Sequence, residues 1–171
     1  MKMISPFIQE FQYEGQQTRK LLEVVPDDQF SFRPHEKSMT LQGLTSHLIE
    51  VLTWVPETCT KDTFVFDMST YTPFVVASMS EALETYDKLL GAAIETLEGV
   101  SDEAYLAEWK MTDPAGTPMF PPMPRAAVLR SMIMNHQIHH RGQLTVYLRM
   151  VGAKLPGLYG PSADEEPAPA A

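Results

Sequence analysis

The chain has 171 residues, 44% of them hydrophobic, and a formal net charge of -9 at pH 7. This length suits one domain with a substantial core and is too short to favour two. The acidic balance disfavours nucleic-acid phosphates and anionic membrane surfaces as main partners. We therefore expect neither a nucleic-acid partner nor a membrane partner.

Cys59 is the single cysteine of the sequence. It excludes an intrachain disulfide and leaves too little sulfur for a thiolate metal site, which is consistent with a reducing cytoplasm. Charged residues interrupt the N-terminal segment, so no secretory signal is expected, and no apolar run reaches the roughly eighteen residues of a membrane span. The sequence thus predicts a cytoplasmic protein in which any metal must be bound by histidine and oxygen.

Apolar side chains recur three and four positions apart in four segments, which predicts four helices. The first covers about residues 6–25 and ends at a Pro-Asp-Asp stretch, the second covers 40–58, and the third covers 77–98. The fourth begins near Pro124, where a proline in the first turn is well tolerated, and runs to about 151. The pattern predicts an all-α, four-helix-bundle protein.

Two of the connections between these helices are long. Residues 60–76 could form a crossover that lets helices two and three run parallel, a known variation on the up-and-down bundle. Residues 105–123 could contain a short hairpin or form a lid, and the sequence leaves both readings open. We expect a single domain over 1–164 and a disordered tail over 165–171, because the end is rich in proline, alanine and acid.

Three of the five histidines fall within residues 136–140 of the fourth helix. At about 100° per residue, His136 and His140 lie one turn apart on the inward face and form a good pair of metal ligands. His139 lies at the margin of that face and is expected to be an outer partner of the ligands. Arg141 is expected to point away from the core, as a surface, dimer or anion-binding residue.

A bundle can bring His47 of the second helix opposite the pair on the fourth. Three histidines leave a divalent ion one or more open positions for water or substrate. The alternative for a lone histidine on an apolar face is a hydrogen-bonded core residue. Gln143 is expected on the inward face, where it could orient a ligand histidine or a bound water. Gln137 stands where the zincin helix needs a glutamate base, so metalloprotease chemistry is disfavoured.

Three segments together resemble the DinB/YfiT-like family: Leu41–Leu48, Asn135–Leu144 and Tyr147–Ser162. The resemblance covers about residues 5–164. It implies a four-helix bundle in up-down-down-up order, frequent homodimers, and a divalent metal held by three histidines, here His47, His136 and His140. Some relatives look like thiol S-transferases or isomerases that use a low-molecular-weight thiol.

Two functional hypotheses follow, together with a less favoured purely structural bundle that binds no tight metal. The first is a metal-dependent enzyme, a thiol S-transferase or a hydrolase, whose ion, zinc or nickel, binds a thiol or water and lowers its pKa. Its partners would be a small thiol or a small electrophile. The second is a non-catalytic metal-binding or stress-response module that pairs into a homodimer. Cys59 is expected to be an inert thiol, and no residue is assigned a catalytic role.

Overall fold

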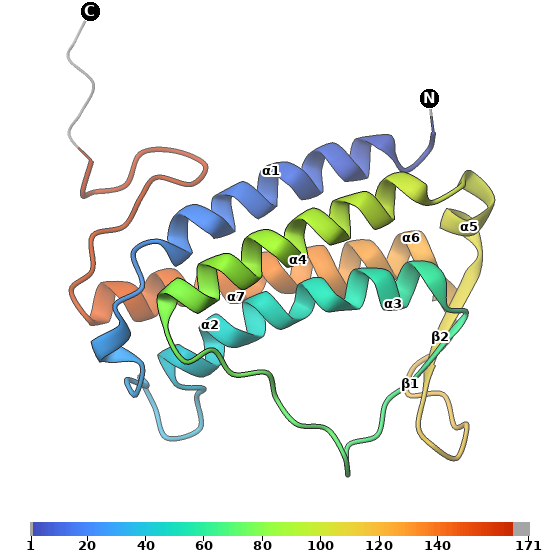
Figure 1. Ribbon diagram of the computed structural model, residues 1–171, viewed down its shortest axis with the longest axis horizontal. Coiled ribbons are helices and arrows are strands. Elements are labelled where there is room, and N and C mark those ends of the chain that lie inside the picture. Colours follow the sequence, from blue (N-terminus) through green and yellow to red (C-terminus); the bar gives the residue numbers. More distant parts are fainter. Residues whose placement is uncertain (1, 166–171) are drawn as a thin grey trace, which may run out of the picture.

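The computed structural model describes residues 2–165 and consists of four long helical arms packed side by side (Figure 1). The first arm is α1 (Ser5–Leu22), and the third is α4 (Met79–Gly99). The second and fourth arms are each built from three consecutive pieces. These are α2 (Leu41–Glu50), the 3-10 turn η2 (Val51–Thr53) and α3 (Trp54–Thr60), and then α6 (Arg125–Val128), the π-helical turn η3 (Leu129–Met134) and α7 (Asn135–Met150).

The order of the arms is up-down-down-up, which confirms the expected fold class. The second arm and α4 run in the same direction, opposite to α1 and to the fourth arm (Figure 1). The parallel pair is joined by a long crossover, residues 61–78, that returns along the bundle, as predicted for residues 60–76. A short 3-10 turn, η1 (Asp27–Gln29), lies in the connection after α1.

Side-chain caps fix where two of the arms begin. The Thr40 hydroxyl accepts a hydrogen bond from the backbone N–H of Gly43 at the start of α2. At the start of α4, Ser78 accepts from the N–H of Glu81, while the Glu81 carboxylate accepts from the N–H of Ala77. This reciprocal pair satisfies two donors that the helix itself leaves unpaired. The caps therefore set the first residues of α2 and α4.

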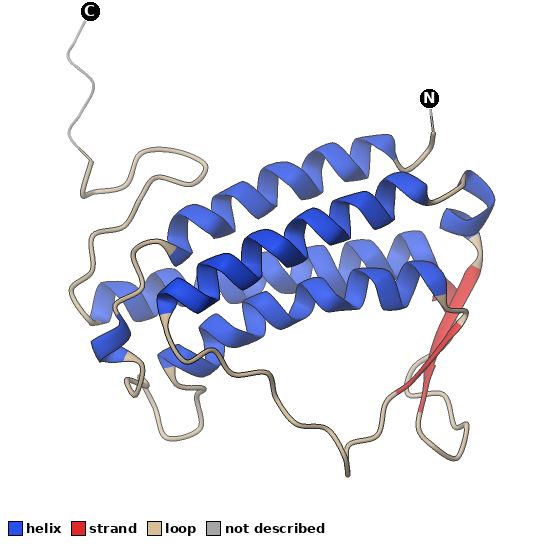
Figure 2. Ribbon diagram, in the orientation of Figure 1, coloured by secondary structure: helices blue, strands red, loops and turns tan. Residues whose placement is uncertain are grey.

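A small three-stranded sheet covers one end of the bundle and joins the two long connections (Figure 2). Strand β1 (Thr63–Val65) from the crossover pairs in parallel with β2 (Glu108–Thr112), and β2 pairs antiparallel with β3 (Met123–Pro124). The short helix α5 (Asp102–Leu106) precedes β2. Of the two readings of residues 105–123, the structure shows the hairpin. The sheet is a minor addition to an otherwise helical fold.

The prediction that Arg141 faces outward is wrong. Its side chain is 2% exposed, and its guanidinium donates to the Glu14 carboxylate at 2.5 Å and to the Glu14 backbone carbonyl at 2.8 Å. It also donates to the Tyr159 hydroxyl, which in turn donates to the same carboxylate at 2.6 Å. Because α7 packs against both α1 and α2, the buried arc of this helix is wider than one apolar stripe.

Among the described residues, no helix is long and apolar enough to cross a membrane. The predicted disordered tail, 165–171, lies outside the described residues except for Glu165, whose carboxylate accepts from the backbone N–H of Gly157 at 2.6 Å.

Arg141→Ala is expected to lower the free energy of unfolding by about 3–5 kcal/mol, because it leaves the Glu14 carboxylate buried without its partner. Arg149→Ala is the matched control, since that side chain is 47% exposed and pairs with Asp164 at the surface, so its loss should cost less than about 1 kcal/mol. Urea unfolding followed by circular dichroism measures both. Equal losses in the two variants would contradict the buried role of Arg141.

Candidate metal centre

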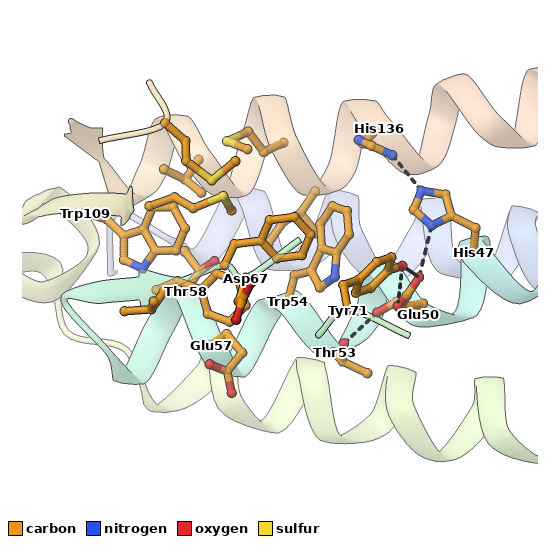
Figure 3. A pocket seen from close by; sticks show the side chains of 18 of the residues that line it. His47, Glu50, Thr53, Trp54, Glu57, Thr58, Asp67, Tyr71, Trp109 and His136 are labelled. Carbon is orange, nitrogen blue, oxygen red and sulfur yellow. Dashed lines mark hydrogen bonds and ion pairs between the residues drawn. The ribbon is translucent and has the colours of Figure 1, made fainter. Parts of the chain in front are cut away.

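His47 of α2 and His136 and His140 of α7 bring their Nε2 atoms to one point. The Nε2 atom of His136 lies 2.9 Å from that of His47 and 2.9 Å from that of His140. Within the described residues, these three form the cluster of potential metal ligands whose donor atoms all lie within 4.8 Å of one another. Figure 3 shows His47 and His136 pointing toward each other across the interface between the two helices.

One hydrogen bond fixes the register of α7 against α2 beside the histidines. The Gln137 side-chain amide, which is buried, donates to the backbone carbonyl of Leu48 at 3.1 Å. Gln137 follows His136, and Leu48 follows His47, so this contact lies one residue beyond the pair it aligns. Gln137, which stands where a zincin has its catalytic glutamate, thus has a structural role, and its side chain lies on a different face of the helix from the histidines.

The outer ring nitrogens of two of the histidines face acceptors. The Nδ1 atom of His47 lies 3.2 Å from a Glu50 carboxylate oxygen, and the Nδ1 atom of His140 lies 2.7 Å from the Gln143 amide oxygen. An acceptor at Nδ1 favours the tautomer that carries its proton there. Both Nε2 atoms then present lone pairs to the centre of the cluster.

The three converging nitrogens can be examined for whether they would accommodate a cation. The Nε2 atom of His136 carries either one lone pair or one proton. It therefore cannot form good hydrogen bonds to the Nε2 atoms of both His47 and His140, which lie 2.9 Å away with their own lone pairs facing inward. A divalent ion is complementary to three converging imidazole lone pairs. The residues present therefore fit a metal bound by three histidines.

Burial also disfavours the charged form of two of the three histidines, both on α7. Burial, followed by the neighbouring His140 and His47, lowers the pKa of His136 to about 4. Burial is likewise the main cause of the lowered pKa of His140. Neutral imidazole is the form that binds metals, so burial favours the metal-binding form of His136 and His140.

Glu50 is the important site residue that the sequence reasoning left without a role. Its carboxylate is 12% exposed and contacts both His47 and the Tyr71 hydroxyl, which donates to it at 2.9 and 3.0 Å. Burial and this carboxylate raise the pKa of Tyr71 to about 12. The i,i+3 spacing of His47 and Glu50 was the available signal, whereas nothing local placed Tyr71 of the crossover loop beside them (Figure 3).

The two residues predicted as outer partners differ in their placement. Gln143 is exposed, in contrast to the expectation that it faces inward, yet its side chain reaches His140. His139 is exposed and lies edge-on to the ring of His140 with 5.0 Å between ring centroids. His139 is outside the cluster of converging nitrogens.

A cavity of about 720 Å³ opens beside the cluster, between the second arm, the fourth arm and the small sheet (Figure 3). His47 and His136 lie at one end of it and Trp109 of β2 at the other. Most of its other lining side chains are aromatic, aliphatic or thioether groups. A small molecule in the cavity would therefore have access to the point where the histidines meet.

Cys59 is half-buried near the end of α3 and is not among the residues that line this cavity. Burial raises the pKa of its thiol to about 11. The thiolate is the nucleophilic form of cysteine, so at neutral pH this residue is a poor nucleophile. The structure thus agrees with the expectation of an inert thiol.

Comparison with known proteins shows that the chain belongs to the DinB family, whose model matches residues 2–169. It is 27% identical over 159 residues to the uncharacterized protein YrdA of Bacillus subtilis, covering 93% of this chain and 89% of YrdA. The crystal structure of a DinB-like protein from Bacillus cereus matches with a TM-score of 0.71 and 29% identity, covering 91% of this chain and 97% of that one.

The same fold occurs in YfiT from Bacillus subtilis, with a TM-score of 0.64 and 16% identity over 86% of each chain. YfiT is described as "a probable metal-dependent hydrolase with an unusual four-helix bundle topology". The arrangement of helices read from the sequence is thus shared with solved members of this group.

Cys59 should react with iodoacetamide about a hundredfold more slowly in the folded protein at pH 8 than in the urea-unfolded chain, because its pKa of about 11 lies about two units above the ordinary value of 9.0. Mass spectrometry of timed samples gives both rates. Comparable rates in the folded and unfolded protein would show an accessible, ionisable thiol and reopen a nucleophilic role for it.

Proposed function

We propose that this protein is a divalent-metal-dependent enzyme in which His47, His136 and His140 hold the ion and the adjoining cavity holds a small substrate. The observation that supports it most directly is the convergence of three imidazole nitrogens at the edge of that cavity. Zinc or nickel suits a site of nitrogen ligands with a position left open. YfiT, with the same fold, supports metal dependence.

Lewis acidity is what such an ion supplies when bound, lowering the pKa of a water or a thiol so that a nucleophile exists near neutral pH. The chain's own residues prepare the site. Glu50 and Gln143 hold the rings of His47 and His140 with their Nε2 atoms inward. Trp54 packs edge-on against His47 and His136, with ring centroids 5.8 and 5.3 Å away, and supports the orientation of both rings.

Thiol transfer is our preferred chemistry, with water as the alternative nucleophile. Cys59 is a poor protein nucleophile, so an external thiol or water must take that part. Glu50 is the carboxylate nearest the cluster, and it already accepts hydrogen bonds from His47 and Tyr71, which suits orientation better than proton abstraction. The alternative of a non-catalytic dimeric module, the homodimer itself and the cytoplasmic location stay predictions.

Metal content tests the proposed ligands. Untagged protein purified without chelator should contain about one divalent ion per chain by elemental analysis, and His47→Ala and His140→Ala should each lose it. Glu50→Gln keeps three histidines but weakens the acceptor at Nδ1, so its affinity should fall about tenfold to a hundredfold. His139→Ala is the matched control and should retain the metal. A full metal content in either ligand variant would overturn the proposed site.

Turnover tests the proposed reaction. The wild-type protein is assayed for displacement of chloride from 1-chloro-2,4-dinitrobenzene by benzyl mercaptan and for hydrolysis of a phenyl ester. At least one of the two rates should fall about a hundredfold or more when the metal is removed by a chelator, and equally in His136→Ala. Adding zinc or nickel to the chelated wild-type protein should restore that rate. Thiol-arm activity supports a transferase and ester-arm activity a hydrolase. Rates that ignore the metal in both arms would contradict an enzymatic role for it.

A further inference from the structure

Resting on the proposed function, we infer that the cavity beside the three histidines selects small molecules whose far end, away from the metal, is apolar and either uncharged or cationic. Molecules with an anionic far end are rejected. This inference names the class of substrate for the proposed enzyme. It is carried by which side chains line the cavity and by the signs of their charges.

The wall of the cavity is mostly apolar and includes several aromatic side chains. It is formed by side chains of the second arm, the crossover, the sheet and the π-helical turn: Trp54, Phe64, Phe66, Trp109, Met111, Met119, Met132 and Ile133. Flat or aliphatic groups bury well against such a wall, and methionine side chains adapt to differing shapes. The cavity volume of about 720 Å³ is in the range of small-molecule sites.

The charged groups of the cavity all have one sign. Glu50, Glu57 and Asp67 line it, and none of its lining residues is lysine or arginine. Two neighbouring cations lie outside the lining and are already paired: Lys61 donates to Glu57 at 2.6 Å, and Arg125 donates to Asp62 and to backbone carbonyls. An anionic group placed against this wall would lose its hydration without gaining a cationic partner.

Trp109 closes the far end of the cavity. The residue is 2% exposed and lies at the end opposite His47 and His136 (Figure 3). Its Nε1–H is buried in the protein and is not accessible from the cavity. The indole therefore offers a ligand a flat, apolar surface at this end.

The metal end has the opposite preference, because a divalent ion held by three neutral histidines attracts an electron-rich donor atom. The ligand class is therefore asymmetric: a thiol or similar donor at one end, an apolar body, and a neutral or cationic group at the other. Thiols that carry free carboxylates at their far end fit poorly, whereas uncharged thiols and amino-thiols fit.

The chain offers a direct readout of binding. It contains two tryptophans, Trp54 and Trp109, and both line the cavity, so intrinsic fluorescence reports on this cavity alone. Three probes share a benzyl mercaptan head and differ only in the para substituent: a carboxamide, a trimethylammonium and a sulfonate. Because the thiol head is the same in all three probes, its contribution to the affinity at the metal end is the same. Differences in affinity therefore report on the para substituent at the far end.

With the metal-loaded wild-type protein, the carboxamide and trimethylammonium probes should bind at least about tenfold more tightly than the sulfonate. Equal affinities, a preference for the sulfonate, or no fluorescence change with any probe would overturn the inference. The metal content of the same samples separates the two proposals. If the probes show the expected order of affinities but the protein holds no metal, the proposed function is wrong and the cavity inference stands. If the protein holds metal but the probes do not show that order, the cavity inference is wrong and the proposed function stands.

Two variants locate the selectivity. Glu57→Gln combined with Asp67→Asn should reduce the preference for trimethylammonium over sulfonate at least about threefold. Glu108→Gln is the matched control: it removes one exposed acid next to Trp109 in the sequence, outside the cavity lining, and should leave the ranking unchanged. An unaltered ranking in the double variant would refute the role assigned to these two acids.

Discussion

The contact between α2 and α7 is the constraint on which the rest of the site depends. Ring nitrogens from two helices meet only if the helices are adjacent and in one register, and the hydrogen bond from Gln137 to the Leu48 carbonyl fixes that register beside the histidines. Histidine is short, so a slip of one helical residue, a 1.5 Å translation with a 100° rotation, would separate His47 from its partners. His47 and His136, which meet at this interface, also form one end of the adjacent cavity.

The sequence carried enough information to predict the bundle and the pairing of His136 with His140, because both lie within the regular helix α7, where the rotation per residue is constant. The parallel second and third arms were predictable from the length of the crossover. The helix boundaries were right to within a few residues. The breaks at η2 and η3 were missed because the apolar pattern continues through a 3-10 turn and a π-helical turn alike.

Tertiary contacts explain the remaining errors. Arg141 was placed outside because a helical wheel assigns one buried face, whereas a bundle helix with two neighbours buries a charge when a partner such as Glu14 meets it there. Tyr71 and Trp109 come from loop and sheet segments whose positions depend on pairing between residues far apart in the chain. No local pattern could place them at the cavity, although their side chains decide much of its chemistry.

The π-helical turn at 129–134 divides the fourth arm into two parts with different tasks. Residues before and within it, including Val128, Met132 and Ile133, line the cavity, whereas His136 and His140 follow it. A π turn accommodates one residue more than an α turn, and such turns often occur at functional sites. Because the extra residue is absorbed there, insertions or deletions at this turn would rotate the cavity wall while leaving the histidines fixed against α2. The turn thus gives the fourth arm's share of the cavity wall a helical phase that differs from that of its metal ligands.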